Sequence, residues 1–184
     1  ISAQIRTDII EMSYRAKAAH LASALSCVDI MTVLYASILH LDSTNYDLPD
    51  RDRFILSKGH AVTALYALLA WKGLIKHDDL KNYGQKGSLL EEHPSPKQIG
   101  VEAATGSLGH GLAIGNGMAL STRITGRDFR VFVLMSDGEC NEGSVWEAAM
   151  FGAQNQLHNL TAIVDYNKWQ ATGRSKEILK LDSL

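Results

Sequence analysis

Apolar side chains recur at three- or four-residue steps along the first sixteen residues of the chain. Ile1, Ile5, Ile9, Met12 and Ala16 therefore fall on one face of a helix. The pattern predicts an amphipathic helix over this stretch, with that face turned to the core.

Two further helices are predicted before residue 74. Ser26 is a candidate N-cap for a helix through CVDIMTVLYASILH, because its hydroxyl can accept a free backbone N–H and Asp29 follows three residues later. The apolar segment AVTALYALLAW at 61–71 predicts a core helix that ends near Gly73 and is too short to cross a bilayer. Residues 74–105 lack any periodicity and are predicted to form a long functional loop.

Three short apolar runs predict strands: RFILS, RVFVLM and LTAIVDY. The last two flank a predicted helix, GSVWEAAMFGAQNQ, and this is the size of a right-handed parallel crossover unit. Nearly continuous apolar runs are typical of a parallel sheet with helices on both faces. We therefore expect an α/β fold in three layers, α/β/α, with an open, mostly parallel sheet.

One domain over residues 1–184 accounts for the length of the chain. The chain begins at Ile1 without a methionine and stops soon after the charged segment RSKEILKLD. From this we expect a fragment, or the ordered part of a longer subunit, with a domain that is incomplete at its C-terminal end.

Charge and cysteine usage exclude several classes of function. The formal net charge is -2 and no basic tract is present, which argues against a nucleic-acid partner. Cys27 and Cys140 lie far apart and form no Cys-x-x-Cys pair, so neither a disulfide framework nor a zinc site is expected. No secretory signal or membrane span is visible, and we expect a cytoplasmic protein.

Polar residues end the last two predicted strands. In a parallel unit the side chains of Asp137 and Asn167 emerge at the same edge of the sheet, which is the edge where ligands bind in such folds. One carboxylate and one amide oxygen suit Mg²⁺, which completes its coordination with water and substrate phosphate. The alternative is that both are ordinary turn residues that bond their own backbone.

The glycine-rich segment around residues 106–117 does not fit a nucleotide motif. Ile114 stands where a dinucleotide fingerprint needs its third glycine, and no Gly-Lys-Ser/Thr follows. Gly115 and Gly117 are interpreted as positions where a buried helix packs closely. Gly106 and Gly109 lie in the loop before that helix and fit close approach of the backbone to a ligand.

Four of the seven histidines lie near helix ends or in loops: His20, His60, His93 and His110. None forms a His-x-x-x-His pair, so histidine ligation of a metal is disfavoured. A single histidine is usually structural, whereas several in one cleft would suit proton transfer and recognition of sugar hydroxyls.

These motifs together resemble one family. The stretch SDGECNEGSVWEAAMFGAQNQLHNLTAIVDYNKWQATG resembles the thiamine diphosphate signature of transketolases, with Asp-Gly-Glu, Glu-Gly, Trp-Glu-Ala and a later Asn-x-x-Gln in the same order. LSKGHAVTALYALLAWKG, EHPSP and GVEAATGSLGHGLAIGNGMAL resemble other blocks of the family's diphosphate-binding half, the PP domain. The similarity runs from about Ile5 to Ile178.

The resemblance implies a cofactor site at the strand ends. Asp137 and Asn167 would bind Mg²⁺ through their side chains, and Trp169 would bind it through its backbone carbonyl. The amide of Gly138 would face the diphosphate. The departure is Ser136, which replaces the glycine that usually precedes this aspartate and leaves the metal ligand itself in place.

The resemblance also implies residues around the rest of the cofactor and the substrate. Backbone groups of Gly106 and Leu108 would line the aminopyrimidine, while His20, His60 and His93 would surround the thiazolium and the hydroxyls of the donor sugar. His60 would contact the cofactor as well. The segment AAHLAS replaces the commoner Ser-Gly-His sequence around the first of these histidines.

Glu142 matches an acidic residue of the family's subunit interface, linked to the glutamate by which the partner activates the cofactor. The pyrimidine-binding half that carries this glutamate has no counterpart in the chain. The resemblance therefore implies the N-terminal subunit of a split transketolase that depends on thiamine diphosphate and Mg²⁺. It would transfer a two-carbon ketol unit from a ketose to an aldose, with a C-terminal pyrimidine-binding subunit, in a dimer of heterodimers.

Two alternatives remain open at this point. One is a thiamine diphosphate-dependent carboligase of specialised metabolism with a keto-acid donor, and the other is a non-catalytic binding or assembly subunit. The α subunit of a pyruvate dehydrogenase fits the motifs less closely. A nucleophilic role for Cys140 is disfavoured, because nothing near it in sequence would activate the thiol.

Overall fold

The computed structural model describes residues 1–41, 44, 46–171 and 173–181. Its centre is a three-stranded parallel sheet with the order β1-β2-β3. The strands are β1 (Arg53–Leu56), β2 (Val131–Ser136) and β3 (Leu160–Asp165). In the register of the sheet, Leu56 pairs with Leu134, and Ser136 pairs with Asp165. The parallel crossover predicted from the sequence is confirmed.

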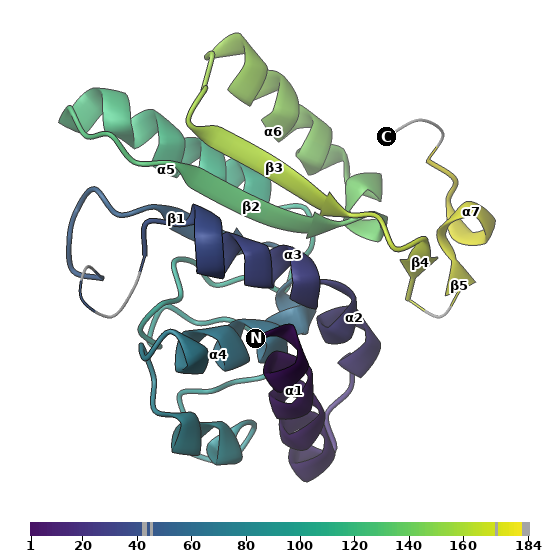
Figure 1. The fold of residues 1–184 in the computed structure, drawn as a ribbon. Coiled ribbons are helices and arrows are strands. Elements are labelled where there is room, and N and C mark those ends of the chain that lie inside the picture. Colours follow the sequence, from purple (N-terminus) through teal and green to yellow (C-terminus); the bar gives the residue numbers. More distant parts are fainter. Residues whose placement is uncertain (42–43, 45, 172, 182–184) are drawn as a thin grey trace.

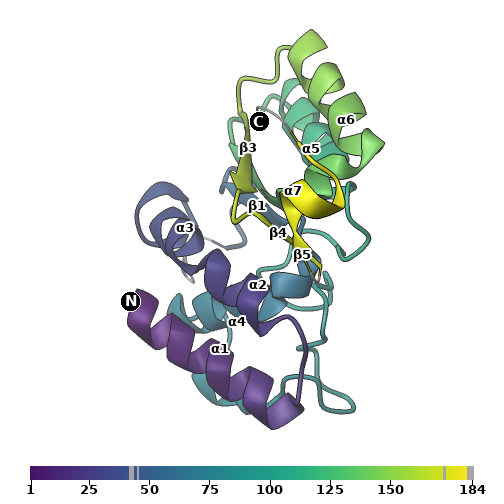
Figure 2. The same cartoon turned by 90° about the vertical axis from the view of Figure 1, so that its right-hand side faces the viewer.

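Helices cover both faces of the sheet and produce the predicted three layers (Figure 1). Two lie on one face, α5 (Gly111–Thr125) and α6 (Gly143–Gln154). The opposite face carries α1 (Ser2–Ala16), α2 (Leu21–Ser26), α3 (Val28–Val33) with its π-helical extension Leu34–Ile38, and α4 (Val62–Trp71). The view turned by 90° shows the sheet between these two groups of helices (Figure 2).

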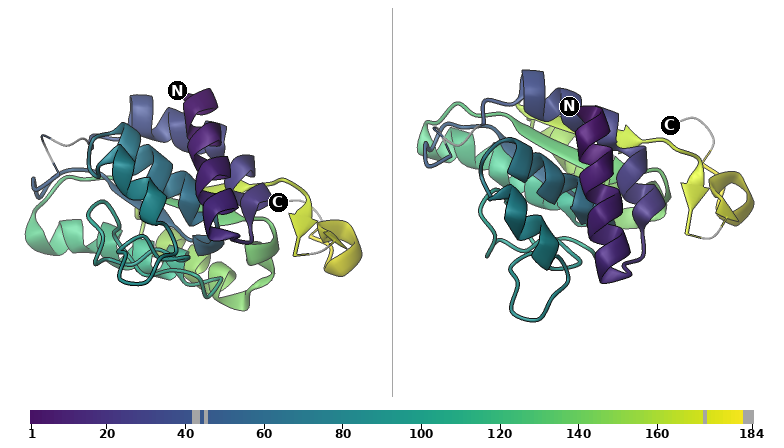
Figure 3. Two further views of the ribbon diagram at one scale, coloured as in Figure 1. Left: turned by 90° about the horizontal axis from the view of Figure 1, so that it is seen from below. Right: turned by 60° about the horizontal axis from the view of Figure 1, so that its bottom comes forward.

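Short elements complete the fold. Three are 3-10 helices, at Gly59–Ala61, His77–Asn82 and Gly138–Asn141. The second of these is the one regular element described between residues 74 and 105, so the predicted irregular structure of this segment is confirmed apart from this short helix. After β3, the chain forms a hairpin of β4 (Trp169–Gln170) and β5 (Gly173–Arg174), followed by α7 (Ser175–Ile178). Figure 3 shows this C-terminal segment projecting beside the main body.

The two faces of the sheet belong to separate apolar clusters. Phe54 and Leu56 of β1 pack with α1 and α4, whereas Ile55 between them packs with α5 and α6. This alternation follows from the period of two along a strand. The α4 helix is buried from Val62 to Leu69, as its apolar sequence predicts.

Four details of the sequence prediction are wrong. Ser26 ends α2 instead of capping the next helix, and its hydroxyl bonds Asp165. Gly117 faces open space, so Gly115 alone makes the predicted close contact, against Val133. Ile1 precedes α1 and is 54% exposed.

The fourth error concerns β3. All six side chains of β2 are buried, but Thr161 and Ala162 of β3 are exposed. The reason is that β3 is an edge strand: β2 pairs with one side of it, and no described strand pairs with the other. A groove lined by α5, α6 and β3 residues, including Leu112 and Ala162, runs beside this strand.

Candidate cofactor site at the carboxyl edge of the sheet

Polar residues follow each of the three strands at one edge of the sheet. Ser57 and Lys58 follow β1, Asp137 follows β2, and Asp165 ends β3. Each is at most 5% exposed, so these polar groups lie inside the protein. Parallel strands bring such termini together, and the carboxyl edge of an open α/β sheet is the usual place for a ligand.

Asp137 is completely buried and accepts three hydrogen bonds. Its Oδ1 accepts from the backbone N–H of Gly138 at 3.0 Å. Its Oδ2 accepts from the backbone N–H of Lys168 at 3.0 Å and from the hydroxyl of Ser175 at 2.8 Å. Within the described part of the chain Asp137 forms no ion pair, so the buried carboxylate has no partner charge there.

Asn167 lies two residues beyond β3 and is half-buried. Its Oδ1 accepts from the backbone N–H of Trp169 at 2.8 Å. Because Lys168, between these two, donates to Asp137, the turn after β3 and the end of β2 lie side by side. The sequence predicted this proximity. Trp169 itself is 52% exposed. The guanidinium carbon of Arg174 lies over the Trp169 ring, 4.3 Å from the ring centroid.

Glu139 is a central residue that the sequence analysis missed. Its side chain is fully buried and accepts hydrogen bonds from the Ser57 hydroxyl, from Gly109 N at 2.9 Å and from Ser136 N at 3.3 Å. One carboxylate thus joins the ends of β1 and β2 to the glycine loop before α5. The signal in the sequence was an acid between Gly138 and a cysteine, but its burial depends on the tertiary fold.

Lys58 and Asp165 form a buried ion pair that the sequence did not reveal. Lys58 Nζ lies 2.7 Å from Asp165 Oδ2, and the lysine side chain is 0% exposed. The Ser26 hydroxyl lies 2.7 Å from the same oxygen. Asp165 therefore connects β3 to β1 and to α2.

The three histidines named from the family resemblance converge in space. The rings of His20 and His60 have centroids 5.2 Å apart. His93 lies against Gly106, where an added Cβ would stand 2.6 Å from its ring. Burial, together with the nearby charges of Lys58, His20 and His93, lowers the pKa of His60 to about 4. His60 is therefore neutral at physiological pH.

Two backbones touch beside these histidines. A Cβ on Gly59 would lie 2.7–2.8 Å from backbone atoms of Thr105 and Gly106, so only glycine fits there. Gly106 and Gly109 have φ values of +146° and +84°, which favour glycine. The half-buried Leu108 lies between them. The loop predicted to approach the cofactor is thus fixed against the end of β1.

Gly138 lies at the first turn of the 3-10 helix after β2, beneath Gln170 of β4. A Cβ at Gly138 would stand 2.9 Å from Cγ of that glutamine. The hairpin after β3 therefore packs on the position predicted to face the diphosphate.

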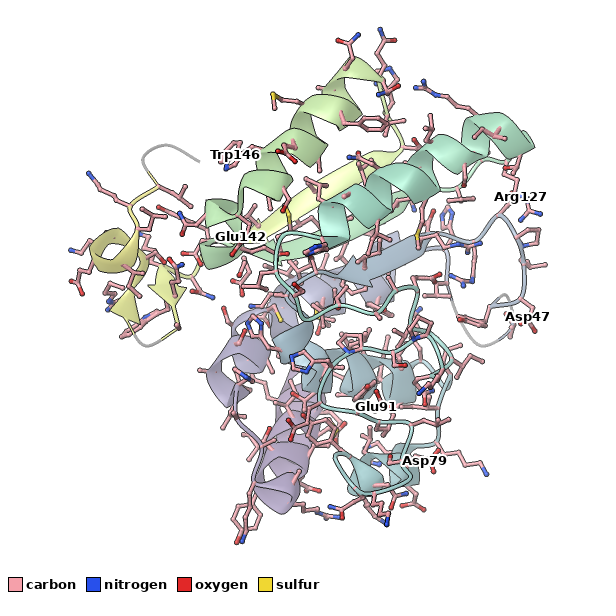
Figure 4. The ribbon with its side chains drawn as sticks, turned by 180° about the vertical axis from the view of Figure 1, so that it is seen from behind. Asp47, Asp79, Glu91, Arg127, Glu142 and Trp146 are labelled. Carbon is pink, nitrogen blue, oxygen red and sulfur yellow. The ribbon has the colours of Figure 1, made fainter. Side chains whose placement is uncertain are left out.

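Glu142 is exposed and precedes α6. Figure 4 shows Glu142 and Trp146 at the end of α6 that faces the carboxyl edge of the sheet. Trp146, Met150 and Phe151 add 47%, 66% and 45% exposed apolar side chains along this helix. An acidic and apolar surface thus begins directly beside the candidate site.

Other groups take no part in this arrangement. His110 is exposed, and its Nδ1 lies 3.1 Å from the carbonyl oxygen of Leu108. Cys27 and Cys140 are buried free thiols. Burial, with Glu139 and Asp137 nearby, raises the pKa of Cys140 to about 11, which keeps the thiol protonated and argues against a nucleophilic role.

No cluster of three or more His, Cys, Asp or Glu side chains that could hold a metal is found among the described residues. The predicted magnesium ligands are not a cluster of this type, because they combine one carboxylate with a side-chain amide and a backbone carbonyl. In the same part of the chain, no helix is long and apolar enough to cross a membrane.

An open parallel sheet with buried acids, a glycine loop and converging histidines at its carboxyl edge defines a ligand-binding α/β domain. Residues 1–183 match the family described as transketolase, thiamine diphosphate binding domain. The chain belongs to this family, as the resemblance of its motifs implied.

Named relatives are similar over nearly the whole chain. It is 43% identical to an apulose-4-phosphate transketolase subunit of Phocaeicola vulgatus, over 97% of this chain and 64% of that protein. It is 38% identical to the 6-deoxy-6-sulfo-D-fructose transketolase subunit SqwG of a Clostridium species, over 90% of this chain and 60% of that protein. The chain thus spans less than two thirds of the length of these relatives.

Solved structures agree with this assignment. The transketolase from Campylobacter jejuni has a TM-score of 0.92 and 29% identity to this chain. The match covers 98% of this chain and 30% of that one. The described fold therefore corresponds to one part of a complete transketolase chain.

Proposed function

We propose that residues 1–184 form the thiamine diphosphate-binding domain of the N-terminal subunit of a split, transketolase-like enzyme. The enzyme transfers a two-carbon ketol unit from a ketose or ketose phosphate to an aldose. The observation that carries this proposal is the buried carboxylate of Asp137, held next to the turn of Asn167 at the carboxyl edge. The names of two relatives as transketolase subunits support the split arrangement.

The residues at this edge suit a magnesium diphosphate. Asp137 and Asn167 offer side-chain oxygens, and Trp169 offers a backbone carbonyl, which is the kind of donor set that Mg²⁺ takes. A cation beside Asp137 would compensate a negative charge that has hydrogen bonds but no described ion pair. Gly138 would direct its amide to the diphosphate once it exchanges its bond to Asp137 for one to the ligand.

The bound cofactor supplies the carbon that attacks the donor carbonyl and the electron sink for cleavage of the carbon–carbon bond. The chain supplies position and proton handling. His60 is neutral and can accept or donate a hydrogen bond at a substrate hydroxyl, while the exposed His20 and His93 border the same space. Gly106 and Leu108 would present backbone groups to the aminopyrimidine.

The exposed surface of α6 supports a partner subunit. Trp146, Met150 and Phe151 present apolar area, and Glu142 precedes them at the site. We assign this surface to the pyrimidine-binding partner, with Glu142 linked to the partner's activating glutamate, in a dimer of heterodimers. The two free cysteines suit a cytoplasmic location.

A donor screen of the full-length protein, purified with its partner subunit, tests the function. Ketose phosphates and ketoses with other substituents are compared with pyruvate, each with an aldose acceptor. We expect two-carbon transfer from a ketose donor, abolished in Asp137→Ala. Turnover of pyruvate alone would replace the transketolase assignment by a carboligase, and cofactor binding without any turnover would favour an assembly subunit.

A further inference from the structure

The side-chain amide of Asn167 donates hydrogen bonds to two residues, one distant in sequence and one at the end of β3. Its Nδ2 donates to Ser26 Oγ at 3.1 Å and to Asp165 Oδ2 at 3.3 Å. Ser26 belongs to α2, 141 positions away in sequence. The Ser26 hydroxyl lies 2.9 and 2.7 Å from the two oxygens of Asp165, so it donates to this carboxylate while it accepts from the amide.

Asp165 is itself fixed by a buried cation. Lys58 Nζ lies 2.7 Å from Asp165 Oδ2 and 3.2 Å from the backbone oxygen of Ser23. The lysine side chain is completely buried, and Asp165 is 5% exposed. Charge-assisted hydrogen bonds in such surroundings are short and well oriented. The Asp165 carboxylate that accepts from the Asn167 amide is therefore held in a defined position.

This arrangement allows only one orientation of the amide. The NH₂ group faces two acceptors, and Oδ1 faces a donor, the backbone N–H of Trp169 at 2.8 Å. A rotation by 180° would place the amide oxygen against the Asp165 carboxylate and the NH₂ group against an N–H. Since an amide oxygen has two lone pairs, Oδ1 keeps one for another partner.

We propose that Ser26 and Asp165 are positioning residues that hold Asn167 with its amide oxygen available to the metal ion. This inference rests on the proposed function, because it takes Asn167 as a ligand of Mg²⁺. Residues that hydrogen-bond a metal-binding side chain set the orientation of that side chain and thereby the affinity of the site for the metal. These hydrogen bonds link α2, β1 and β3 to one metal-binding residue.

Binding of Mn²⁺ in place of Mg²⁺ provides a readout that does not depend on turnover. The full-length protein with its partner subunit is titrated with Mn²⁺ in the presence of thiamine diphosphate, and free Mn²⁺ is followed by electron paramagnetic resonance. Ser26→Ala removes one of the two acceptors of the Asn167 amide and leaves the Lys58–Asp165 pair in place. Ser26→Thr keeps the hydroxyl. Asp165→Asn serves as a secondary variant, because loss of the charge that faces buried Lys58 also destabilises the fold.

A hydroxyl bonded within its own helix serves as the control. Ser121 lies on α5, and its Oγ donates to the carbonyl of Met118 at 2.7 Å, so Ser121→Ala tests the generic effect of removing a hydroxyl. We expect Ser26→Ala to weaken Mn²⁺ binding about tenfold. Ser26→Thr and Ser121→Ala should bind as the wild type does, and the melting temperature without metal should be similar in all three variants.

The possible failures are distinct. Equal Mn²⁺ affinity in Ser26→Ala and the wild type, together with a loss in Asp137→Ala, would overturn the positioning role and leave the proposed function intact. A wild-type protein that binds no Mn²⁺ with the cofactor, or an Asp137→Ala variant that binds it equally well, would overturn both. A weakened Ser26→Ala variant that Thr does not rescue would also contradict the role of the hydroxyl.

Discussion

A carboxylate oxygen of Glu139 lies 2.9 Å from the backbone nitrogen of Gly109, across 30 positions of sequence. Through this bond the end of β2 holds the glycine loop that precedes α5. Because the same carboxylate accepts from Ser57, the glycine loop and the ends of two strands share one anchor.

Glu139→Ala should therefore destabilise the protein and weaken cofactor binding together. The variant leaves the buried N–H of Gly109 and the hydroxyl of Ser57 without their acceptor, at about 1–3 kcal/mol for each group. Urea denaturation and a thiamine diphosphate titration measure the two effects. Glu11→Ala, at an exposed position of α1, is the matched control and should change neither. Equal behaviour of the two variants would refute the anchoring role.

The backbone contact at Gly59 predicts opposite effects at two glycines. Gly59→Ala forces a Cβ against backbone atoms of Thr105 and Gly106, and such overpacking costs about 1–3 kcal/mol. Gly117→Ala adds a Cβ in open space within α5 and should stabilise by about 0.5–1 kcal/mol. Thermal unfolding distinguishes them, and a neutral Gly59→Ala would contradict the described loop contact.

The lowered pKa of His60 predicts how stability depends on pH. The folded state holds the pKa at about 4, mainly by burial, against 6.5 for an ordinary histidine. Between these values the unfolded chain binds the proton and the folded protein does not, so stability falls as the pH drops from about 6.5 toward 4. His60→Gln should flatten the curve of unfolding free energy in this window. His158→Gln, an exposed control, should keep it; identical curves for all three proteins would contradict the burial of His60.

The proposed assignment of the α6 surface to a partner subunit leads to a prediction about association. Met150→Asp places a charge on an apolar side chain that is 66% exposed, so the fold should tolerate it while association weakens by at least tenfold. Ile124→Asp, at an 80% exposed position near the end of α5, is the control. Sedimentation of the reconstituted pair measures both, and unchanged association of Met150→Asp would move the interface elsewhere.

The sequence predicted the parts of this structure that depend on local patterns. The apolar runs located β1, β2 and β3. The ends of the last two runs placed Asp137 near the turn of Asn167. Gly115 and Gly117 show the limit, because both lie on one helix and only the former faces the sheet. Composition near a glycine does not reveal which side of its helix meets a neighbour.

Long-range polar contacts lay beyond reach for a different reason. Ser26 has the sequence signature of a helix cap, yet its hydroxyl bonds a carboxylate 139 positions away. The burial of Lys58 and Glu139 likewise depends on strand order, which no local spacing encodes. The grouping of His20, His60 and His93 came from family resemblance, since the three lie on separate segments. The fold then brought them together.

The central claim is that Asp137 and Asn167 hold magnesium and, through it, thiamine diphosphate. Calorimetric titration of the full-length protein and its partner with thiamine diphosphate, with and without Mg²⁺, tests it most directly. Asp137→Asn removes the buried charge with little change of shape, and Asp128→Asn changes an exposed aspartate as the control. We predict magnesium-dependent binding in the wild type and the control, and its loss in Asp137→Asn. Binding that ignores Mg²⁺, or that survives in Asp137→Asn, would contradict the account.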